Sequence, residues 1–552
     1  MPQAVKTRSR TGCQTCRRRH IQCDEQRPTC QRCLTGNQTC QYAPIVIPLR
    51  ERRMLQKQAL LPGQQVPWAL TPHAMGGQKL LAANTMDPFD TLPIKMPFKS
   101  RELYHYFYQA GTAFEVVPSD LKRDCIALST LDEHALRSTI LLAGIHYCWN
   151  IGDLRGFESA FLFHKVESIR TINTGLERSD HKSFIICVRQ ILTIALAEAC
   201  LGNLPAAEAH INGVMALFNS RAHSNSINRP ENTEIDGELA NRYLILTSCF
   251  LLALKSRLQS FKHYLVAHGL DPSTDESSTE ALRLMSIWHG LEKGGLLARL
   301  KAMRMFPYFF SPPPPAFHVT DINALPILDS LRDITEAVDL VRRDPGGEHI
   351  DRMWNEGGPT RLMLVLVEAH VEGFNGGDRR KGERETGAGL ELRTSWSGIA
   401  AATELYLHCV LGVMNAGEPM ECRLLCQIVL VLKEDVMRTW GDSGAGGSMT
   451  RSLWFWKVFI GVLALSGGNR HERTTRGGAA GNSAEVCSCG MGQEELYAWF
   501  CNCARAWSAD TGIMRWSTVQ SVLSMICWPT TLSKDGKDHA AYTWDHVTDH
   551  AV

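Results

Sequence analysis

The sequence predicts a small metal-stabilised module at the N-terminus, followed by a linker and a large all-α domain. Three observations favour this fold class. Six cysteines lie between residues 13 and 40 at regular spacing. Apolar residues recur with a helical period through most of the chain after residue 86, and few stretches alternate for long enough to indicate strands. With 552 residues, of which 44% are apolar, the chain is long enough to bury a large core.

The six cysteines repeat one half-motif. Their spacing is C-x2-C-x6-C-x6-C-x2-C-x6-C, so that C-x2-C-x6-C occurs twice with a 17-residue offset. Zinc prefers four tetrahedral ligands, and thiolates fill all four positions at many structural sites. Two zinc ions offer about eight ligand positions, so six thiolates suffice if two of them bridge both ions. We therefore predict a two-zinc site formed by Cys13, Cys16, Cys23, Cys30, Cys33 and Cys40.

Three other uses of these cysteines are less favoured. Three disulfides would suit a secreted peptide, but the N-terminus has no apolar signal segment. Metal storage would not require such regular spacing. A single zinc ion held by the two C-x2-C pairs would leave Cys23 and Cys40 without a role.

Charge is divided unevenly along the chain. Residues 1–53 contain eleven Lys and Arg against three Asp and Glu, a formal charge of +8, whereas the whole chain carries +1. The residues that follow therefore carry −7. In the first half of the cysteine motif (residues 13–23), three consecutive arginines follow the C-x2-C pair. The second half (residues 30–40) has only Arg32. A basic head on a mildly acidic body indicates that the head alone binds a polyanion.

This stretch resembles the DNA-binding module of the fungal binuclear zinc cluster transcription factors. The usual pattern of that family is C-x2-C-R-x-R-K-x-K-C-D-x3-P-x-C-x2-C-x6-C, and this chain has CQTCRRRHIQCDEQRPTCQRCLTGNQTC. Besides the cysteines, four residues match the pattern: Arg17, Arg19, Asp24 and Pro28. The resemblance implies that two zinc ions are the cofactors, bridged by Cys13 and Cys30.

The resemblance also implies a function. We expect a nuclear, sequence-specific regulator of transcription by RNA polymerase II, whose zinc cluster reads the major groove of double-stranded DNA, at CGG-like half-sites. Co-regulators or the transcription machinery would be its further partners. The expected DNA contacts are Arg17, Arg18, Arg19, His20 and Gln22. His20 stands where the family usually has a base-contacting lysine, and Gln22 replaces another basic residue, so the preferred DNA sequence is open. The alternative is a nuclear zinc-knuckle protein that binds protein or RNA.

The domain organisation follows from composition. We expect a basic arm at residues 1–12, the zinc cluster at 13–43, a linker at 44–85, an all-α regulatory domain at 86–311 and a helical continuation at 312–552. Residues 48–62 allow at most one short helix, fewer than the three or four heptads of a coiled coil. Dimerisation through the linker is therefore not supported, and a monomer or a homodimer formed by the body remains open.

Helical patterns dominate the body. Residues 183–201 carry an apolar stripe, and residues 238–258 are apolar enough to be buried on all sides. The body more weakly resembles the helical regulatory region of the same fungal factors, over residues 85–310. In the continuation, Gly-rich stretches at 375–389, 441–448 and 467–483 predict loops or disordered segments.

Other functions find little support. No metalloprotease, P-loop or dinucleotide-binding motif is present, so we do not expect an enzyme. Four cysteines in two C-x-C pairs (487, 489, 501 and 503) are a weak second metal signal, because the spacing is tighter than in most zinc sites. The apolar run at 453–465 is too short to span a membrane and contains Lys457, and its aromatic residues indicate a core.

Overall fold

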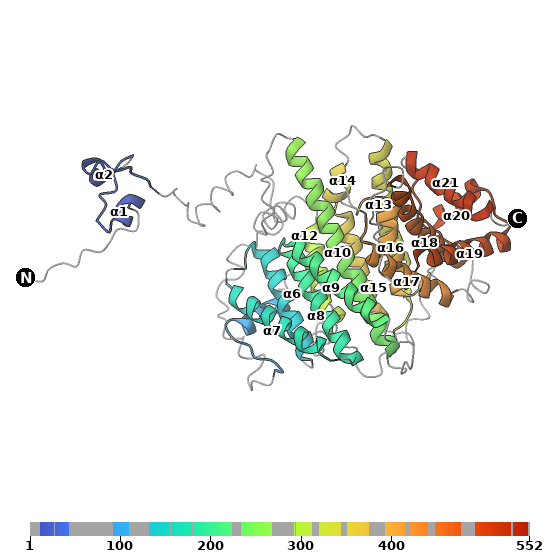
Figure 1. The fold of residues 1–552 in the computed structure, drawn as a ribbon, viewed down its shortest axis with the longest axis horizontal. Coiled ribbons are helices and arrows are strands. Elements are labelled where there is room, and N and C mark those ends of the chain that lie inside the picture. Colours follow the sequence, from blue (N-terminus) through green and yellow to red (C-terminus); the bar gives the residue numbers. More distant parts are fainter. Residues whose placement is uncertain are drawn as a thin grey trace, which may run out of the picture. The chain divides into compact units, whose positions relative to one another are not determined.

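The computed structural model describes residues 12–26, 28–42, 92–109, 132–154, 156–178, 180–222, 233–267, 292, 294–311, 319–343, 350–374, 392–414, 419–439, 448–475, 492–531 and 534–549. The chain divides into two units, Met1–Gln78 and Lys79–Val552 (Figure 1). The predicted basic arm (but for residue 12), the whole of the predicted linker, and the Gly-rich stretch at 375–389 lie outside the described residues.

The first unit contains two short helices, α1 (Gln14–Arg18) and α2 (Gln31–Thr35). Each begins directly after the first cysteine of a half-motif. Five cysteine side chains are buried against one another, and Cys40 and Tyr42 pack on them half-buried. A segment of this length cannot build an ordinary apolar core, which is why the cysteine sulfurs occupy its interior.

The second unit is helical, as the periodicity predicts. Its described helices are α4 (Ser100–Gln109), α6 (Glu133–Ile151), α7 (Glu158–Leu176), α8 (His181–Cys200), α9 (Leu204–Ala222), α10 (Thr233–Ala267), α12 (Gly295–Phe310), α13 (Leu325–Arg343), α14 (Ile350–Asn355), α15 (Gly358–Phe374), α16 (Trp396–Leu405), the π-helix η4 (Tyr406–Val410), α17 (Cys422–Thr439), α18 (Ser448–Thr475), α19 (Gln493–Thr511), α20 (Trp516–Ile526) and α21 (Lys534–Asp549). The strands of the described part are β1 (Ile322–Asn323) and β2 (Arg393–Thr394), paired antiparallel. The predicted fold class is confirmed.

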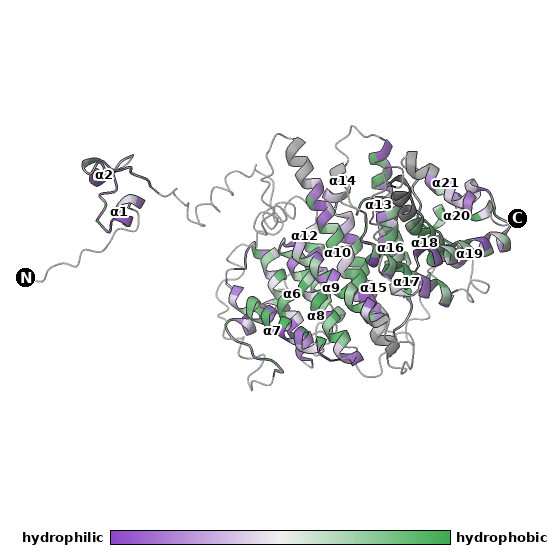
Figure 2. Cartoon of the chain, in the orientation of Figure 1, coloured by the Kyte–Doolittle hydropathy of each residue, from purple (hydrophilic) through white to green (hydrophobic). Residues whose placement is uncertain are grey.

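Helix α8 lies at the centre of the N-terminal part of this unit and contacts α6, α7, α9 and α10. Asp180 caps it by accepting the backbone N–H of Ser183 at 2.8 Å. Among the described residues, α8 alone is long and apolar enough to cross a membrane, but 89% of its most apolar window is buried inside the protein. Figure 2 shows this apolar character shared by neighbouring helices. Helix α8 is therefore explained as a core helix.

The C-terminal part is organised around α18, which contacts α16, α17, α19, α20 and α21. Phe455 stacks on Trp507 of α19 with ring centroids 3.6 Å apart. Trp456 donates its indole N–H to the carbonyl of Cys527 at 2.7 Å. Both Phe455 and Trp456 are fully buried. The prediction that the aromatic residues of this run form a core is confirmed.

Some features of the helical unit were not predicted from the sequence. Helix α18 continues to Thr475, so the predicted loop at 467–483 does not begin at Gly467. Several helices were not predicted, and α12 is an example, because Pro307 interrupts its pattern near the C-terminal end. Residues on either side of position 311 also contact each other: Arg299 donates to the hydroxyl of Thr360 at 3.0 Å, and Arg242 lies 3.3 Å from His370. Residues 86–311 and 312–552 thus pack as one unit.

Candidate metal centre and nucleic-acid interface

The two halves of the cysteine motif fold alike. Cys13 and Cys30 are the N-cap residues of α1 and α2. The sulfur of Cys13 accepts the N–H of Cys16 at 3.3 Å, and that of Cys30 accepts the N–H of Cys33 at the same distance. At the start of each short helix, the N-cap cysteine and the cysteine three residues later therefore place their sulfurs close together. The third sulfur of each half accepts the backbone N–H of the first cysteine: Cys23 from Cys13, and Cys40 from Cys30, both at 3.4 Å.

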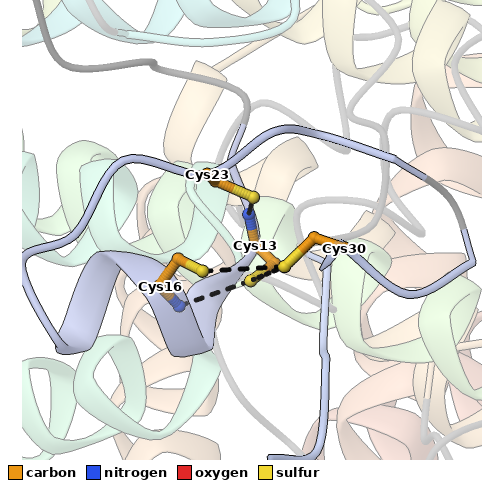
Figure 3. A group of neighbouring side chains, drawn as sticks. All are labelled: Cys13, Cys16, Cys23 and Cys30. Carbon is orange, nitrogen blue, oxygen red and sulfur yellow. Dashed lines mark hydrogen bonds between the residues drawn. The ribbon is translucent and has the colours of Figure 1, made fainter. Parts of the chain in front are cut away.

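The six sulfurs form two groups of four that share two members. One group is Cys13, Cys16, Cys23 and Cys30, and the other is Cys13, Cys30, Cys33 and Cys40. Within each group the sulfurs lie within 4.8 Å of one another. Figure 3 shows the first group, with the sulfurs of Cys13, Cys16 and Cys30 close together.

The sulfur separations fit zinc. Cys13 and Cys30 lie 3.7 Å apart, and Cys16 and Cys30 3.6 Å apart. A zinc ion with four sulfurs at about 2.3 Å has tetrahedral edges of about 3.8 Å. A disulfide would need a separation near 2.05 Å, and all six cysteines are free. The donor set and the spacing therefore suit two tetrahedral thiolate sites that share an edge.

Electrostatics favour thiolates at the two shared positions. Burial raises the pKa of Cys13, but hydrogen bonds from the backbone N–H of Cys16 and from neighbouring thiols bring that pKa below its usual value. Burial likewise raises the pKa of Cys30, but hydrogen bonds from the backbone N–H of Cys33 and from the thiols of Cys33 and Cys16 together bring that pKa below its usual value. A thiolate is the form that binds zinc.

Both helices end in the same turn. The N–H of His20 donates to the carbonyl of Arg17, and the N–H of Ile21 to that of Cys16. Seventeen residues later Asn37 and Gln38 repeat this arrangement. It is a Schellman motif, whose penultimate residue adopts a left-handed backbone. His20 has a φ of 56° and Asn37 a φ of 45°.

Several contacts tie the halves together. Asp24 accepts the backbone N–H of Gln31 at 2.9 Å, and this hydrogen bond lowers the pKa of the carboxyl. The family pattern includes Asp24, so the sequence signalled this residue. It did not signal Tyr42, which packs on the sulfur cluster and donates to the carbonyl of Gln26 at 2.8 Å.

The predicted DNA-binding residues lie together on the first half. All five are exposed: Arg17, Arg18, Arg19, His20 and Gln22. Arg19 differs from the others because its Nη1 lies 3.3 Å from where a Cβ on Gly36 would be. Its guanidinium thus reaches the turn after α2, and a larger residue at position 36 would push against it.

Comparison with known proteins decides what this unit is. Residues 11–46 match the model of the fungal Zn(2)-Cys(6) binuclear cluster domain. This segment is a binuclear zinc cluster domain. Its six cysteines hold two zinc ions, as the family description states and as the two overlapping sulfur groups allow.

The curated relatives are fungal regulators. Transcription factor lfc1 of Flammulina velutipes is 50% identical over 44 residues, which are 8% of this chain and 16% of the relative. Transcriptional regulatory protein moc3 of Schizosaccharomyces pombe is 49% identical over 43 residues, 8% of each chain. Sterol uptake control protein 2 of Saccharomyces cerevisiae is 45% identical over 38 residues, 7% of this chain and 4% of the relative.

The similarity is local. The chain spans less than a fifth of the length of each of these relatives, and each aligned stretch is about as long as a zinc cluster domain. None of the three is named as an enzyme. No solved structure matches this chain.

The structure adds no support for a second metal site at the two C-x-C pairs. Cys501 is buried and Cys503 half-buried on α19. Their predicted partners at positions 487 and 489 lie outside the described residues. Among the described residues, groups of sulfur, imidazole or carboxylate ligands close enough to hold a metal occur only in the zinc cluster domain.

Proposed function

We propose that this protein is a nuclear, sequence-specific DNA-binding regulator of transcription. The observation that carries the proposal is the contrast between two halves of equal fold and unequal charge. The first half exposes three consecutive arginines beside α1, and α2 carries only Arg32. A cationic surface on one side of a rigid module suits a phosphate backbone.

The proposed metal scheme uses all six cysteines. Cys13 and Cys30 bridge both zinc ions, because they are the two members that the four-sulfur groups share. Cys16 and Cys23 complete one ion, and Cys33 and Cys40 the other. Zinc binding supplies the folding free energy that so small a module cannot obtain from an apolar core.

The proposed DNA contacts divide by position. The end of α1 enters the major groove, and Arg17 and Arg18 in its last turn bind phosphates. His20 projects from the left-handed turn after α1, where its imidazole N–H donates to guanine N7 or O6 of a CGG-like half-site. Gln22 adds a polar contact. Arg19, which reaches Gly36, contributes charge and also supports the angle between the two halves.

The remainder of the chain has the regulatory role in this proposal. Residues 13–43 are the DNA-binding domain, 44–85 a linker, 86–311 a helical regulatory domain and 312–552 its continuation. The boundary between the two units, at residue 78, falls inside the proposed linker. Co-regulators or the transcription machinery would bind the helical unit, which is also the place for a homodimer contact.

Selection of bound sites from a random DNA pool tests this function. The full chain, loaded with zinc, should enrich duplexes that contain CGG-like triplets, and a chelator should abolish the enrichment. Single-stranded RNA of the same length should compete weakly. Enrichment of no sequence, or stronger binding to RNA, would contradict the proposal and favour a zinc-knuckle protein of another kind.

A further inference from the structure

Three of the four sulfurs around each zinc ion are fully enclosed. In the proposed metal scheme, on which this inference rests, two cysteines serve both ions, and each ion has one further ligand from a C-x2-C pair. The cysteines in these positions are all 0% exposed: Cys13, Cys16, Cys30 and Cys33. In the exposure of their ligands, the two ions therefore differ at the fourth position, which is Cys23 for one ion and Cys40 for the other.

The sulfur of Cys23 is buried and has three polar neighbours that carry a proton. Cys23 is 7% exposed, and its sulfur accepts the backbone N–H of Cys13 at 3.4 Å (Figure 3). It accepts the backbone N–H of Glu25 at the same distance, and the hydroxyl oxygen of Tyr42 lies 3.7 Å away. Such contacts orient a metal ligand and stabilise its charged form.

The sulfur of Cys40 has fewer such contacts. Cys40 is half-buried, and within residues 12–26 and 28–42 its sulfur accepts one backbone N–H, that of Cys30 at 3.4 Å. Its other polar neighbours are cysteines of the cluster. Zinc binds cysteine as the thiolate, which has no proton to donate. Chelators and electrophiles therefore reach the sulfur of Cys40 more easily than that of Cys23.

Tyr42 causes part of this difference. It follows the second half of the motif, 17 residues after Glu25, and packs half-buried on the sulfur cluster. Its hydroxyl has one proton, which it donates to the carbonyl of Gln26 at 2.8 Å. This hydrogen bond joins the segment after Cys40 to the segment after Cys23, and it holds the hydroxyl end of the ring beside the sulfur of Cys23.

We propose that Tyr42 is a positioning residue of the metal centre and that it makes the two zinc ions unequal in lability. By covering Cys23 and fixing the segment that follows it, Tyr42 slows the loss of the ion held by Cys16 and Cys23. The ion held by Cys33 and Cys40 leaves first, when a chelator or an electrophile attacks at Cys40. Tyr42 acts through Cys23 and does not bind the metal itself.

Zinc release from the zinc-loaded full chain to the chromogenic chelator pyridylazoresorcinol tests this inequality. About one zinc per chain should leave in a fast phase. The other should leave at least about tenfold more slowly, the usual effect of an outer contact on a metal site. Iodoacetamide, added with the chelator, forms a carbon–sulfur bond with a thiolate as iodide leaves. Peptide mapping after the fast phase should find Cys40 alkylated and Cys23 intact.

Replacements of Tyr42 test its part in the slow phase. Tyr42→Ala uncovers Cys23 and should bring the slow phase close to the fast one, with Cys23 now alkylated. Tyr42→Phe keeps the ring but loses the hydrogen bond to Gln26. It should speed the slow phase only about two- to tenfold, the usual worth of one hydrogen bond. Tyr542→Ala makes the same change at a 64% exposed residue of α21 and should leave both phases unchanged.

Three results would overturn the proposal: release of both ions in one phase from the unmodified chain, alkylation of Cys23 as fast as that of Cys40, or an unchanged slow phase in Tyr42→Ala. Where Tyr42→Ala does not fold, an unchanged slow phase in Tyr42→Phe overturns it equally. The bridging scheme is tested separately, by the zinc content of Cys13→Ala without a chelator, so the two failures are distinguishable. None of these outcomes bears on whether the zinc cluster domain binds DNA.

Discussion

The ammonium group of Lys457 lies 2.6 Å from a carboxylate oxygen of Asp435 inside the helical unit, and both side chains are at most 2% exposed. Lys457 also contacts the hydroxyl of Thr394, and Asp435 accepts the hydroxyl of Ser395, the N-cap residue of α16. One ion pair therefore joins β2, α16, α17 and α18.

Breaking this pair should destabilise the helical unit strongly. Lys457→Met removes the buried cation of Asp435 and leaves only the mostly exposed Arg438, 3.6 Å away. Breaking a buried ion pair typically costs about 3–5 kcal/mol. The double variant Lys457→Met/Asp435→Leu should recover part of that loss, because no buried charge remains. Denaturant unfolding followed by circular dichroism measures the difference. The exposed pair Arg451 and Asp510 is the control, and Arg451→Ala should cost less than about 1 kcal/mol. Equal costs for Lys457→Met and Arg451→Ala would show that the buried pair is not important for stability.

Zinc content should depend on which cysteine is replaced. Cys13→Ala removes a ligand from both proposed ions and should lose both, with unfolding of the domain. Cys40→Ala removes a ligand from one ion only and leaves the other four-sulfur group complete, so about one zinc per chain should remain. Elemental analysis of the purified chain gives the ratio, with Cys503→Ala as a control that keeps both ions. A Cys13→Ala chain that still holds two zinc ions would rule out the bridging scheme.

Replacements of His20 should separate its backbone from its side chain. His20→Gly relieves the left-handed strain, worth about 1 kcal/mol, and removes the imidazole. The domain should become harder to unfold, yet DNA binding should weaken. His20→Lys adds a charge and should tighten binding or change the preferred site.

Asn37 provides the matched control for His20, because it occupies the same left-handed position in the turn after α2. Asn37→Gly should change stability in the same direction without changing DNA affinity. Gel-shift titrations and site selection measure the binding. If His20→Gly and Asn37→Gly alter DNA binding equally, His20 does not contact the bases.

The salt dependence of DNA binding should identify phosphate contacts. Arg18→Ala should weaken binding to all sequences alike and lower the slope of log affinity against log salt by about 1. Arg32→Ala, which removes the cation between the cysteines of the second half, should leave the slope unchanged. Affinity measured at several salt concentrations gives both slopes. An equal fall in slope for the two variants would mean that the halves contribute equally to phosphate binding.

The buried acid Glu404 of α16 should make stability depend on pH. An unfolded glutamate titrates near 4.5, whereas the pKa of Glu404 is raised to about 8 by burial. Between these values the folded state keeps a proton that the unfolded state has lost. Stability therefore falls as pH rises, by up to about 1.4 kcal/mol per pH unit. Glu404→Gln should remove this contribution, so its stability relative to the unmodified chain should increase from pH 5 to pH 8. A difference that stays constant with pH would mean that Glu404 is ionised when folded.

Much of the architecture was predictable because it depends on short-range patterns. The helix predicted at 183–201 is α8 (His181–Cys200), and the one predicted at 238–258 lies within α10 (Thr233–Ala267). Helix α7 was missed because its pattern is mixed: His164 and Ser168 face the core, while Leu162 and Val166 are exposed. A residue type alone does not say which face of a helix is covered.

The sequence by itself determined the zinc cluster domain, since ligand type and spacing over 28 residues suffice to specify a tetrahedral thiolate site. It also determined the helical class of the body, which depends on periodicity. Only the tertiary structure decided the rest. Lys457 interrupts an apolar run in the sequence, but in the fold it meets Asp435 from another helix. Glu404 meets Ser248 across 156 residues of chain. Burial and pairing of charged groups arise from contacts between distant segments, and no local pattern of residues encodes them.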